Sequence, residues 1–561
     1  MSFQTLDLAV VAVYFALLMV VGLWKGRGKR ESSGAYFFSR GTLPWWAMGC
    51  AYVAAGMNTE QLVGQNGMGY TVGLTVVNWY YTTVVVVYTA LIFFFFPLYL
   101  RKRVHTVPEY LGRRFDERSK HVFAVLLLVS YIFLNLAVVF YGGAKVLEGI
   151  FGWNLWGWLV VLALVAGVYT TYGGMSSMVY TAVVQFLIIF VAGFLVFLRG
   201  YLKLPNGWSD VVEHAPGGFH LMQPMDYEVI PWHAIPLTLF GLHLFYSCMN
   251  QAMVQRGFGA RSEWDVRIAI IFTGFCVFLR PFIEIFPGMI ARALAFTGHA
   301  EFDLGITSGN DGIDVDAVFP MLINGLVPAG LRGLIVAGIL ASVMSTISAF
   351  MNSIATLFTY DVYKKWIRKD ADDRDLVRVG MVATLVLMVF GVFYSPIIGH
   401  LGGIFRYFQA AASCLAVPIA TVFLFGMFWK RATPAAALVV MVAGIPLGLV
   451  VAVLLGGISL GEAVPWTASV LPVFPAEVID RYSLDNFFIQ AGITQVLCSV
   501  LMVWVSLVTR PRPEAEAAAL MWSKSMIRLP EGEPRRPWFA SAGFWWAIFV
   551  AFYAGVIIYL W

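Results

Sequence analysis

Hydrophobic residues dominate this chain in long runs that are separated by short polar connections. The first run, LDLAVVAVYFALLMVVGLW, covers 6–24, and the last, FWWAIFVAFYAGVIIYLW, covers 544–561. Each is close to the roughly 20 residues with which a helix crosses a bilayer, and about fourteen such runs can be counted. The pattern predicts an all-α polytopic protein of the plasma or inner membrane with about 14 transmembrane helices.

The composition supports this prediction and narrows the function. Hydrophobic residues make up 60% of the 561 residues and charged ones only 12%, with a mean hydropathy of +0.78. A soluble globular protein of this length would not tolerate such a composition. No nucleophile, metal or acid–base constellation converges in the sequence, so an enzyme is not expected.

Lysine and arginine concentrate in alternate connections, which the positive-inside rule places in the cytoplasm. With an even number of spans, both termini then face outward. The net charge of +5 therefore reflects topology, and no nucleic-acid partner is expected. The basic connections are 25–30, 101–120, 364–378, 430–431 and 510–536, and the longer, more acidic ones between them are 203–230, 299–320 and 458–482.

One apolar run is interrupted by the polar, glycine-flanked stretch AAGMNTEQLVGQNGMGY at 54–70. Backbone groups in hydrocarbon must be satisfied inside the protein. The stretch is therefore either an unwound break that lines a wet cavity, with carbonyls free to bind a cation, or a glycine-kinked helix whose polar side chains bond to neighbouring helices.

A second interrupted run, GLHLFYSCMNQAMVQR at 241–256, follows about five spans later. Paired broken helices in two halves are the best sequence indication of a transporter built from inverted repeats, with its site at mid-membrane. His243, in this run, is either a satisfied buried histidine or a group that contacts the solute. The second break favours the unwound-break interpretation of the first.

A third feature is ASVMSTISAFMNSIATLFTYDVY at 341–363. Small and polar residues recur there at intervals of three and four, which places them on one helical face. They predict either close helix packing with back-bonded hydroxyls or a cage of neutral oxygens that suits a monovalent cation such as sodium. Elsewhere, Arg280 and Glu284 are spaced i, i+4 and are read as a structural ion pair, with a proton relay as the alternative.

These residues lie within motifs that resemble those of the solute:sodium symporter family, and within it the sodium/glucose-type cotransporters. The resemblance extends from about Tyr36 to about Ala432. The motifs are LPWWAMG at 43, TVPEYLGRRF at 106, TTYGGMSSMVYT at 170, NQAMVQR at 250, MNSIATLFTYDVYKK at 351 and FGMFWKRAT at 425.

The resemblance implies a ten-helix inverted-repeat core of the sodium/leucine transporter type that works by alternating access. Extra helices are expected at both ends. The implied divisions are an N-terminal helix and loop at 1–43, a first five-helix repeat at 44–200, an external loop at 201–231, a second repeat at 232–429, and C-terminal helices at 430–561 with a cytoplasmic loop at 509–540.

The resemblance also implies where the coupling ion, Na⁺, binds; no organic cofactor is expected. Carbonyls of Ala54, Met57 and Ser342 and hydroxyls of Ser345 and Thr346 fall at the family's sodium positions. Sugar cotransporters carry an acid after the YGG motif, where this chain has Ala182. That departure puts a second sodium site in doubt.

For the solute, the matched positions differ partly from a galactose pocket. A hydroxyl-rich solute is therefore expected, with galactose itself in doubt, and tight discrimination is typical of sites that bond hydroxyls. The expected solute-binding residues are Gln61, Tyr80, Thr83, His243, Tyr246 and Gln409. The expected gate residues are Gln65, Trp79, Phe405 and Tyr246, the last closing the pocket from the cytoplasmic side.

The chain is therefore expected to be a sodium-coupled symporter that imports a sugar or polyol, in the lipid bilayer and compatible with a monomer. Two alternatives stay open. One is a symporter of another small solute, such as an acidic sugar, carboxylate or amino acid. The other is a sodium-independent or proton-coupled carrier, an alternative that is suggested by Ala182 and His243.

Overall fold

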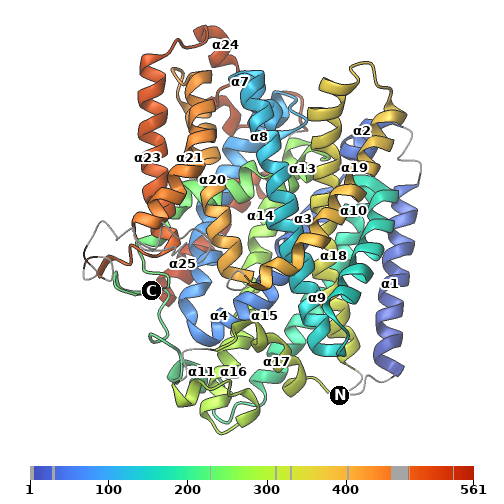
Figure 1. Cartoon of the computed structure of the whole chain (residues 1–561), viewed down its shortest axis with the longest axis vertical. Coiled ribbons are helices and arrows are strands. Elements are labelled where there is room, and N and C mark those ends of the chain that lie inside the picture. The colour runs from blue at the N-terminus through green and yellow to red at the C-terminus, as the bar shows by residue number, and fades with distance from the viewer. Residues whose placement is uncertain are drawn as a thin grey trace.

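The computed structural model is a bundle of long helices, without a strand in the part of the chain that it describes (Figure 1). Ten helical stretches there are long and apolar enough to cross a membrane, and shorter apolar helices accompany them. An all-α, multi-pass protein is thereby confirmed, while the count of about 14 spans stays a prediction. The described residues are 5–27, 32–227, 229–309, 313–328, 331–400, 404–455, 475, 478, 481–534 and 536–561; side chains between 399 and 411 are not described.

The first half contains several helices that are interrupted at defined points. α10 is kinked at Gly174, whose φ of 56° and ψ of −156° are readily adopted only by glycine. The helices are α1 Thr5–Gly26, α2 Ser33–Phe38, α3 Trp45–Gly56, α4 Gln65–Thr71, α5 Asn78–Ala90, α6 Phe96–Arg101, α7 Val107–Arg114, α8 Glu117–Ser130, α9 Ala137–Phe151 and α10 Leu155–Tyr201.

The second half of the chain also contains interrupted helices, and α18 is the longest helix in it. This helix is buried along nearly its whole length. The helices are α11 Trp208–Glu213, α12 Ala234–Thr238, α13 Gln251–Phe258, α14 Glu263–Leu279, α15 Pro281–Glu284, α16 Phe286–Phe296, α17 Val318–Leu326, α18 Arg332–Leu357, α19 Asp373–Tyr394, α20 Ile404–Phe428, α21 Pro434–Leu454, α23 Phe487–Val508, α24 Glu514–Ala519 and α25 Ala542–Leu560.

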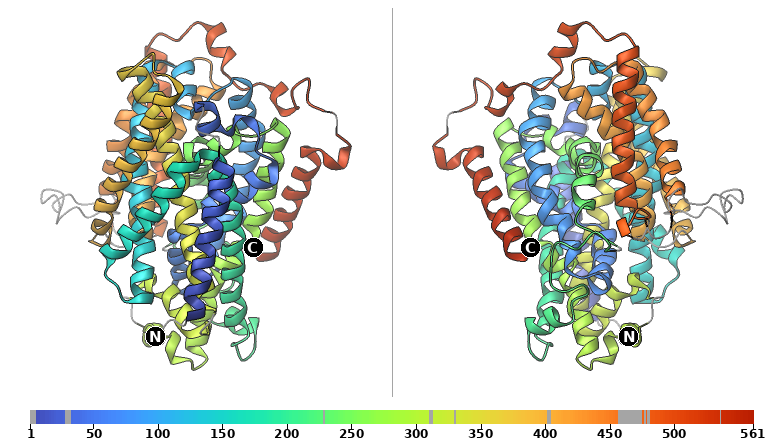
Figure 2. Two further views of the ribbon diagram at one scale, coloured as in Figure 1. Left: turned by 90° about the vertical axis from the view of Figure 1, so that its right-hand side faces the viewer. Right: turned by 90° about the vertical axis from the view of Figure 1, so that its left-hand side faces the viewer.

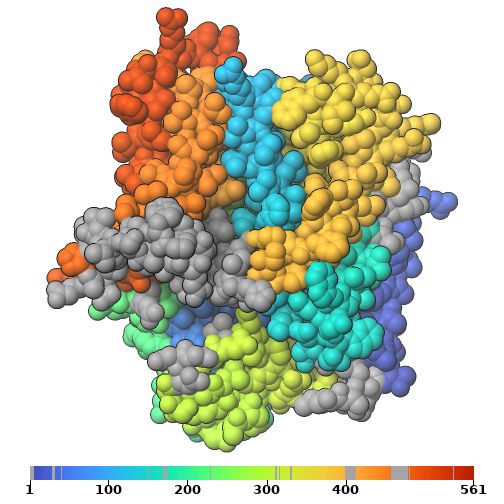
Figure 3. All heavy atoms as spheres, viewed as in Figure 1, coloured from blue at the N-terminus to red at the C-terminus, as the bar shows by residue number. Residues whose placement is uncertain are grey.

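Helices that are distant in sequence lie side by side throughout the bundle. Figure 3 shows α8 between α21 and the helical turn 358–367, and contacts join α8 to both. At one buried contact α16 packs directly on α4: a Cβ atom added to Gly288 would lie 1.9 Å from the carbonyl oxygen of Asn66. Only glycine permits this approach.

The basic connections gather at one end of the bundle, the upper end in Figure 1. Lys120 Nζ lies 2.8 Å from Asp361 Oδ1, and Lys430 Nζ lies 2.9 Å from Glu514 Oε1. Near the C-terminal end of the chain, by contrast, a contact is made to a connection predicted to be external, and near the N-terminal end a contact is made to α18. Asp7 Oδ1 accepts a 2.7 Å bond from the amide at the start of α18, and the Leu221 amide donates to the Leu560 carbonyl across 3.0 Å. This arrangement agrees with both termini lying on one side; which side faces outward stays a prediction.

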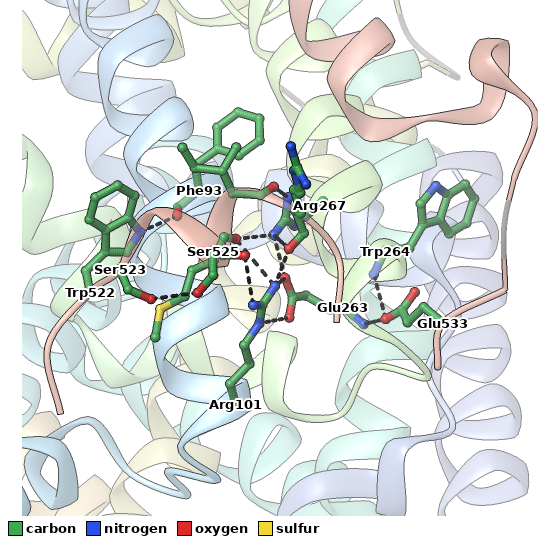
Figure 4. A network of polar contacts seen from close by, with 12 residues as sticks. Phe93, Arg101, Glu263, Trp264, Arg267, Trp522, Ser523, Ser525 and Glu533 are labelled. Atoms are coloured by element: carbon green, nitrogen blue, oxygen red, sulfur yellow. Dashed lines mark hydrogen bonds and ion pairs between the residues drawn. The ribbon is translucent and has the colours of Figure 1, made fainter. Parts of the chain in front are cut away.

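A segment between α24 and α25, residues 520–534 and 536–540, crosses the basic end of the bundle (Figure 2). We call it the strap. Arg101 and Arg267 donate to its main-chain carbonyls at 525–528, and Glu263 accepts from both guanidinium groups (Figure 4). Glu533 in turn accepts a 2.7 Å bond from the amide of Glu263 at the start of α14. The strap thereby joins α6 to α14.

Candidate functional site

The first polar stretch is a true break in a helix. α3 ends at Gly56, Met57 has a φ of −106° and a ψ of 87°, and the chain resumes as a π-helical turn at Glu60–Gly64 that continues into α4. Asn58 Oδ1 accepts the amide proton of Gln61 across 3.1 Å. The side chain thus satisfies one of the amides that a new helical segment leaves unpaired.

The five residues expected to hold sodium converge at this break. Ser342 Oγ donates to the carbonyl of Met57 across 2.6 Å, and Ser345 Oγ donates to the carbonyl of Ala54 across 2.8 Å. Thr346 Oγ1 donates to the Ser342 carbonyl across 3.1 Å. All five residues are buried. A set of neutral hydroxyl and carbonyl oxygens without a carboxylate fits a monovalent cation better than a divalent one.

The second polar stretch is broken as well. Two π-helical turns, Leu239–His243 and Phe245–Met249, follow one another, and Asn250 has an extended conformation before α13 begins. Its Oδ1 accepts bonds from the Ala252 amide, at 3.0 Å, and from Tyr131 OH, at 2.6 Å. The break is therefore held by the α8–α9 span across the bundle.

A cavity of about 180 Å³ lies between the two breaks. Of the residues expected at the solute site or its gates, six line the cavity: Gln61, Trp79, Tyr80, Thr83, His243 and Tyr246. Gln65 is buried but is not among the described lining residues. Phe405 and Gln409 lie on α20 outside the described side chains, so their expected roles stay predictions.

His243 presents an unsatisfied group in the cavity wall. Its ring is stacked edge-on against Trp79, with centroids 4.5 Å apart. Its Nε2 atom is buried and has no hydrogen-bond partner among the described residues. A buried polar atom without a partner costs free energy, and a solute hydroxyl would satisfy this one.

Gln61 and Tyr80 meet each other in the wall. Tyr80 OH donates its single proton across 2.6 Å to the Glu284 carboxylate, and the same hydroxyl oxygen lies 2.5 Å from Gln61 Oε1. Gln61 Nε2 donates to Glu60, which is buried beside the cavity. These contacts with neighbouring side chains fix the orientation of the Gln61 side-chain amide.

Arg280 is the lining residue whose role sequence reasoning did not find. The expected pair with Glu284 exists, at 3.1 Å, but the guanidinium also lines the cavity and lies 4.7 Å over the ring of Tyr80. The i, i+4 spacing predicts the pair, whereas its neighbours come from other helices. No local signal in the sequence identifies them.

The position of the family departure is buried too. Ala182 supplies no side-chain oxygen, and Gln185, one turn further along α10, has an amide without a hydrogen-bond partner in the described part of the chain.

Comparison with known proteins decides the family. The sequence model of the sodium:solute symporter family matches residues 36–444, which is most of the chain. The chain belongs to this family.

Relatives within the symporter family carry sugar and polyol names. The chain is 33% identical over 460 residues to a sodium/glucose cotransporter of Vibrio parahaemolyticus, covering 79% of this chain and 84% of the relative. It is 31% identical over 479 residues to sodium/myo-inositol cotransporter 2 of Mus musculus, covering 80% of this chain and 70% of that one. The expected family and a transporter rather than an enzyme are thereby confirmed.

The symporter fold is confirmed by a solved structure. The substrate-bound outward-open state of a Na⁺-coupled sialic acid symporter matches with a TM-score of 0.72 at 20% identity, covering 91% of this chain and all of the other. At this identity the likeness establishes the fold alone. The expected all-α symporter fold is thus present.

Proposed function

We propose that this protein is a sodium-coupled symporter that imports a sugar or a sugar-like polyol. The observation that carries the proposal is the meeting of Ser342 and Ser345 with the carbonyls of Met57 and Ala54 at the broken helix. Oxygens of two spans converge there beside a cavity of solute size. Sodium and solute then bind at neighbouring sites that share the broken helix.

The sodium site in this proposal consists of the carbonyls of Ala54, Met57 and Ser342 and the hydroxyls of Ser345 and Thr346. Because α3 ends at Gly56, the carbonyls of Ala54 and Met57 are available to side chains of α18, whose serine hydroxyls donate to them. Ser345 and Thr346 are adjacent on α18, one turn after Ser342. The Ser345 hydroxyl donates to the Ala54 carbonyl of α3, and the Thr346 hydroxyl donates to the Ser342 carbonyl. An ion bound there would hold α3 and α18 together.

The solute class is supported by the chemistry of the cavity wall. Gln61, Tyr80, Thr83 and His243 offer amide, hydroxyl and imidazole groups, while Trp79 and Tyr246 offer aromatic faces. Such a mixture suits a small molecule with many hydroxyl groups and an apolar ring face. The names of the relatives, glucose and myo-inositol cotransporters, point to the same class.

Transport in this proposal follows from shared binding energy. If sodium and solute both stabilise one arrangement of the broken helix, each raises the affinity of the other by the same factor, commonly about 1–3 kcal/mol of coupling. The sodium gradient across the membrane then drives uptake. Tyr246 is the proposed cytoplasmic-side gate of the cavity.

The test is uptake into proteoliposomes loaded with potassium and diluted into sodium. A panel of labelled D-glucose, D-galactose and myo-inositol is compared for the wild type, the double variant Ser345→Ala/Thr346→Ala, and Ser348→Ala. Ser348 is a matched control because it is buried on α18 and bonds back to Met344 within its own helix. Loss of sodium-driven uptake only in the double variant supports the site, whereas unchanged sodium dependence refutes it.

Two further arms separate the alternatives. Competition by acidic sugars, carboxylates and amino acids against the imported sugar tests the solute class. Uptake at clamped pH, with choline in place of sodium, tests the coupling ion. Uptake that persists in choline and follows the pH gradient would replace sodium coupling with proton coupling.

A further inference from the structure

Arg280 touches both halves of the broken helix. Its Nη2 atom donates to the carbonyl of Gly56 across 2.5 Å, and the same atom lies 3.4 Å from Gln61 Oε1. Gly56 is the last residue of α3, and Gln61 lies in the segment that follows the break. One guanidinium from α14–α15 therefore spans the hinge from Gly56 to Gln61.

The Gly56 carbonyl lies next to the proposed sodium ligands in the sequence of the hinge. It lies between Ala54 and Met57, whose carbonyls face the hydroxyls of α18. A cationic side chain at the carbonyl end of a helix is favourable, because the helix dipole is negative there. Arg280 thus fixes the direction of the chain at the point where the proposed sodium ligands project.

The guanidinium is itself held in place from the other side. Glu284 accepts from Arg280 Nε at 3.2 Å and from Nη2 at 3.1 Å, and the Tyr80 ring lies beneath the guanidinium. Glu284 is fully buried and also accepts from Tyr80 OH. Arg280 is therefore part of a rigid wall that includes Tyr80 and Gln61, both expected at the solute site.

We propose that Arg280 is a positioning residue that couples the sodium site to the solute cavity, by holding the Gly56 carbonyl and the Gln61 amide in one fixed arrangement. The proposal rests on the proposed function for the identity of the two sites. Arg280 need not touch the ion. It transmits the ion's effect because a displacement of the hinge moves Gly56 and Gln61 together.

The sign of one result separates positioning from simple electrostatics. Coulomb repulsion between like charges alone predicts that removal of a nearby positive charge strengthens the binding of a cation. A positioning role predicts the opposite. The double variant Arg280→Gln/Glu284→Gln removes one charge of each sign and leaves the net charge unchanged, so weaker sodium binding in this variant reports position.

The experiment measures ²²Na⁺ binding to the purified full-length protein in nanodiscs, with and without D-glucose or myo-inositol. In the double variant we expect the half-saturating sodium concentration to rise by about tenfold, the loss expected for one charge-assisted hydrogen bond. We also expect either sugar to lose its effect on sodium affinity. Arg280→Lys keeps the charge beside Glu284 but lacks the planar fork, and we expect the same rise.

Arg292→Gln is the matched control. Arg292, from the same apolar span, donates to the Tyr70 carbonyl at 3.3 Å, near the far end of α4. Arg292 therefore contacts the same broken helix at a point distant from the hinge. The sodium affinity of the Arg292→Gln variant should stay within about twofold of wild type. Thermal unfolding of each variant checks that the fold is kept, and Arg280→Lys decides the question if the double variant does not fold.

The outcomes are separable. Sodium affinity equal to wild type in both Arg280 variants overturns the positioning role, whatever the solute. If the wild-type protein binds sodium but neither sugar changes its sodium affinity, the sugar assignment is refuted. The sodium affinities of the Arg280 variants still test the positioning role in that case. A wild-type protein that binds no sodium overturns both proposals.

Discussion

Ser342 Oγ donates a 2.6 Å hydrogen bond to the carbonyl oxygen of Met57, and so joins the buried centre of α18 to the break that follows α3. Ser342 enters the proposed sodium site through its carbonyl, whereas Ser345 enters through its hydroxyl. In the proposed site these two serines, one turn apart on α18, therefore have different roles. Replacing each of them by alanine distinguishes the two roles.

Ser342→Ala should change sodium affinity less than Ser345→Ala. The first variant keeps its ligand carbonyl and loses only the bond to Met57, so half-saturation should stay within about threefold while unfolding becomes easier by about 1 kcal/mol. The second loses a ligand oxygen and should shift by about tenfold. The shift of the melting temperature between sodium and choline chloride measures both, with Thr494→Ala on α23 as a remote hydroxyl control. Equal shifts would contradict the division of roles.

His243→Phe should weaken solute binding and spare sodium binding. The phenyl ring keeps the edge-on contact with Trp79 but removes the unpartnered Nε2 atom. The half-saturating concentration of the imported sugar should rise by about tenfold, because one hydrogen bond to a hydroxyl is lost. His121→Phe, whose ring lies against Trp366 at the basic end, serves as the control. An unchanged sugar concentration dependence would remove His243 from the solute site.

Gly288→Ala should destabilise the protein strongly. The added methyl group would lie 1.9 Å from the Asn66 carbonyl oxygen, so α16 and α4 must separate at a cost of about 1–3 kcal/mol. Gly555→Ala on α25 is the matched control because an added Cβ meets nothing within 4 Å there. Thermal unfolding in one detergent should show a drop for Gly288→Ala and none for Gly555→Ala. Similar melting temperatures would show that the two helices are free to move apart.

Glu263→Gln should loosen the strap. Glu263 accepts from Arg101 and Arg267, which present their remaining donors to the carbonyls at 525–528 (Figure 4). Without the carboxylate these guanidinium groups lose their common anchor. Trypsin should then cleave faster after Lys524 and Arg528 in the purified protein. Glu531→Gln, at an exposed strap position, should leave the cleavage rate unchanged, and equal rates in both variants would refute the anchoring role.

Local signals in the sequence and the family resemblance together predict the meeting of α3 with α18. A glycine-flanked polar stretch marks a break with free carbonyls, and hydroxyls three and four residues apart share a helical face. The resemblance adds which residues are involved, and these residues lie together in the structure: Ala54, Met57, Ser342, Ser345 and Thr346. The grouping is thus foreseeable, and sodium binding by it remains to be tested.

The role of Arg280 could not be predicted in the same way. Spacing alone pairs it with Glu284, but α14 ends at Leu279 and Pro281 opens α15, so the direction of the side chain depends on the kink between them. Its partners Gly56 and Gln61 lie more than 200 residues away in sequence. Only tertiary packing brings them within reach.

The strap also has a consequence for the order in which the protein matures. Arg101 and Arg267 leave the ribosome long before residues 525–528, whose carbonyls they bind. Since domains form progressively from the N-terminal end during synthesis, these two guanidinium groups stay without their carbonyl partners in the strap until almost the entire chain has been made. Newly inserted molecules that lack the strap would therefore be distinguishable from finished ones by an open charged surface between α6 and α14.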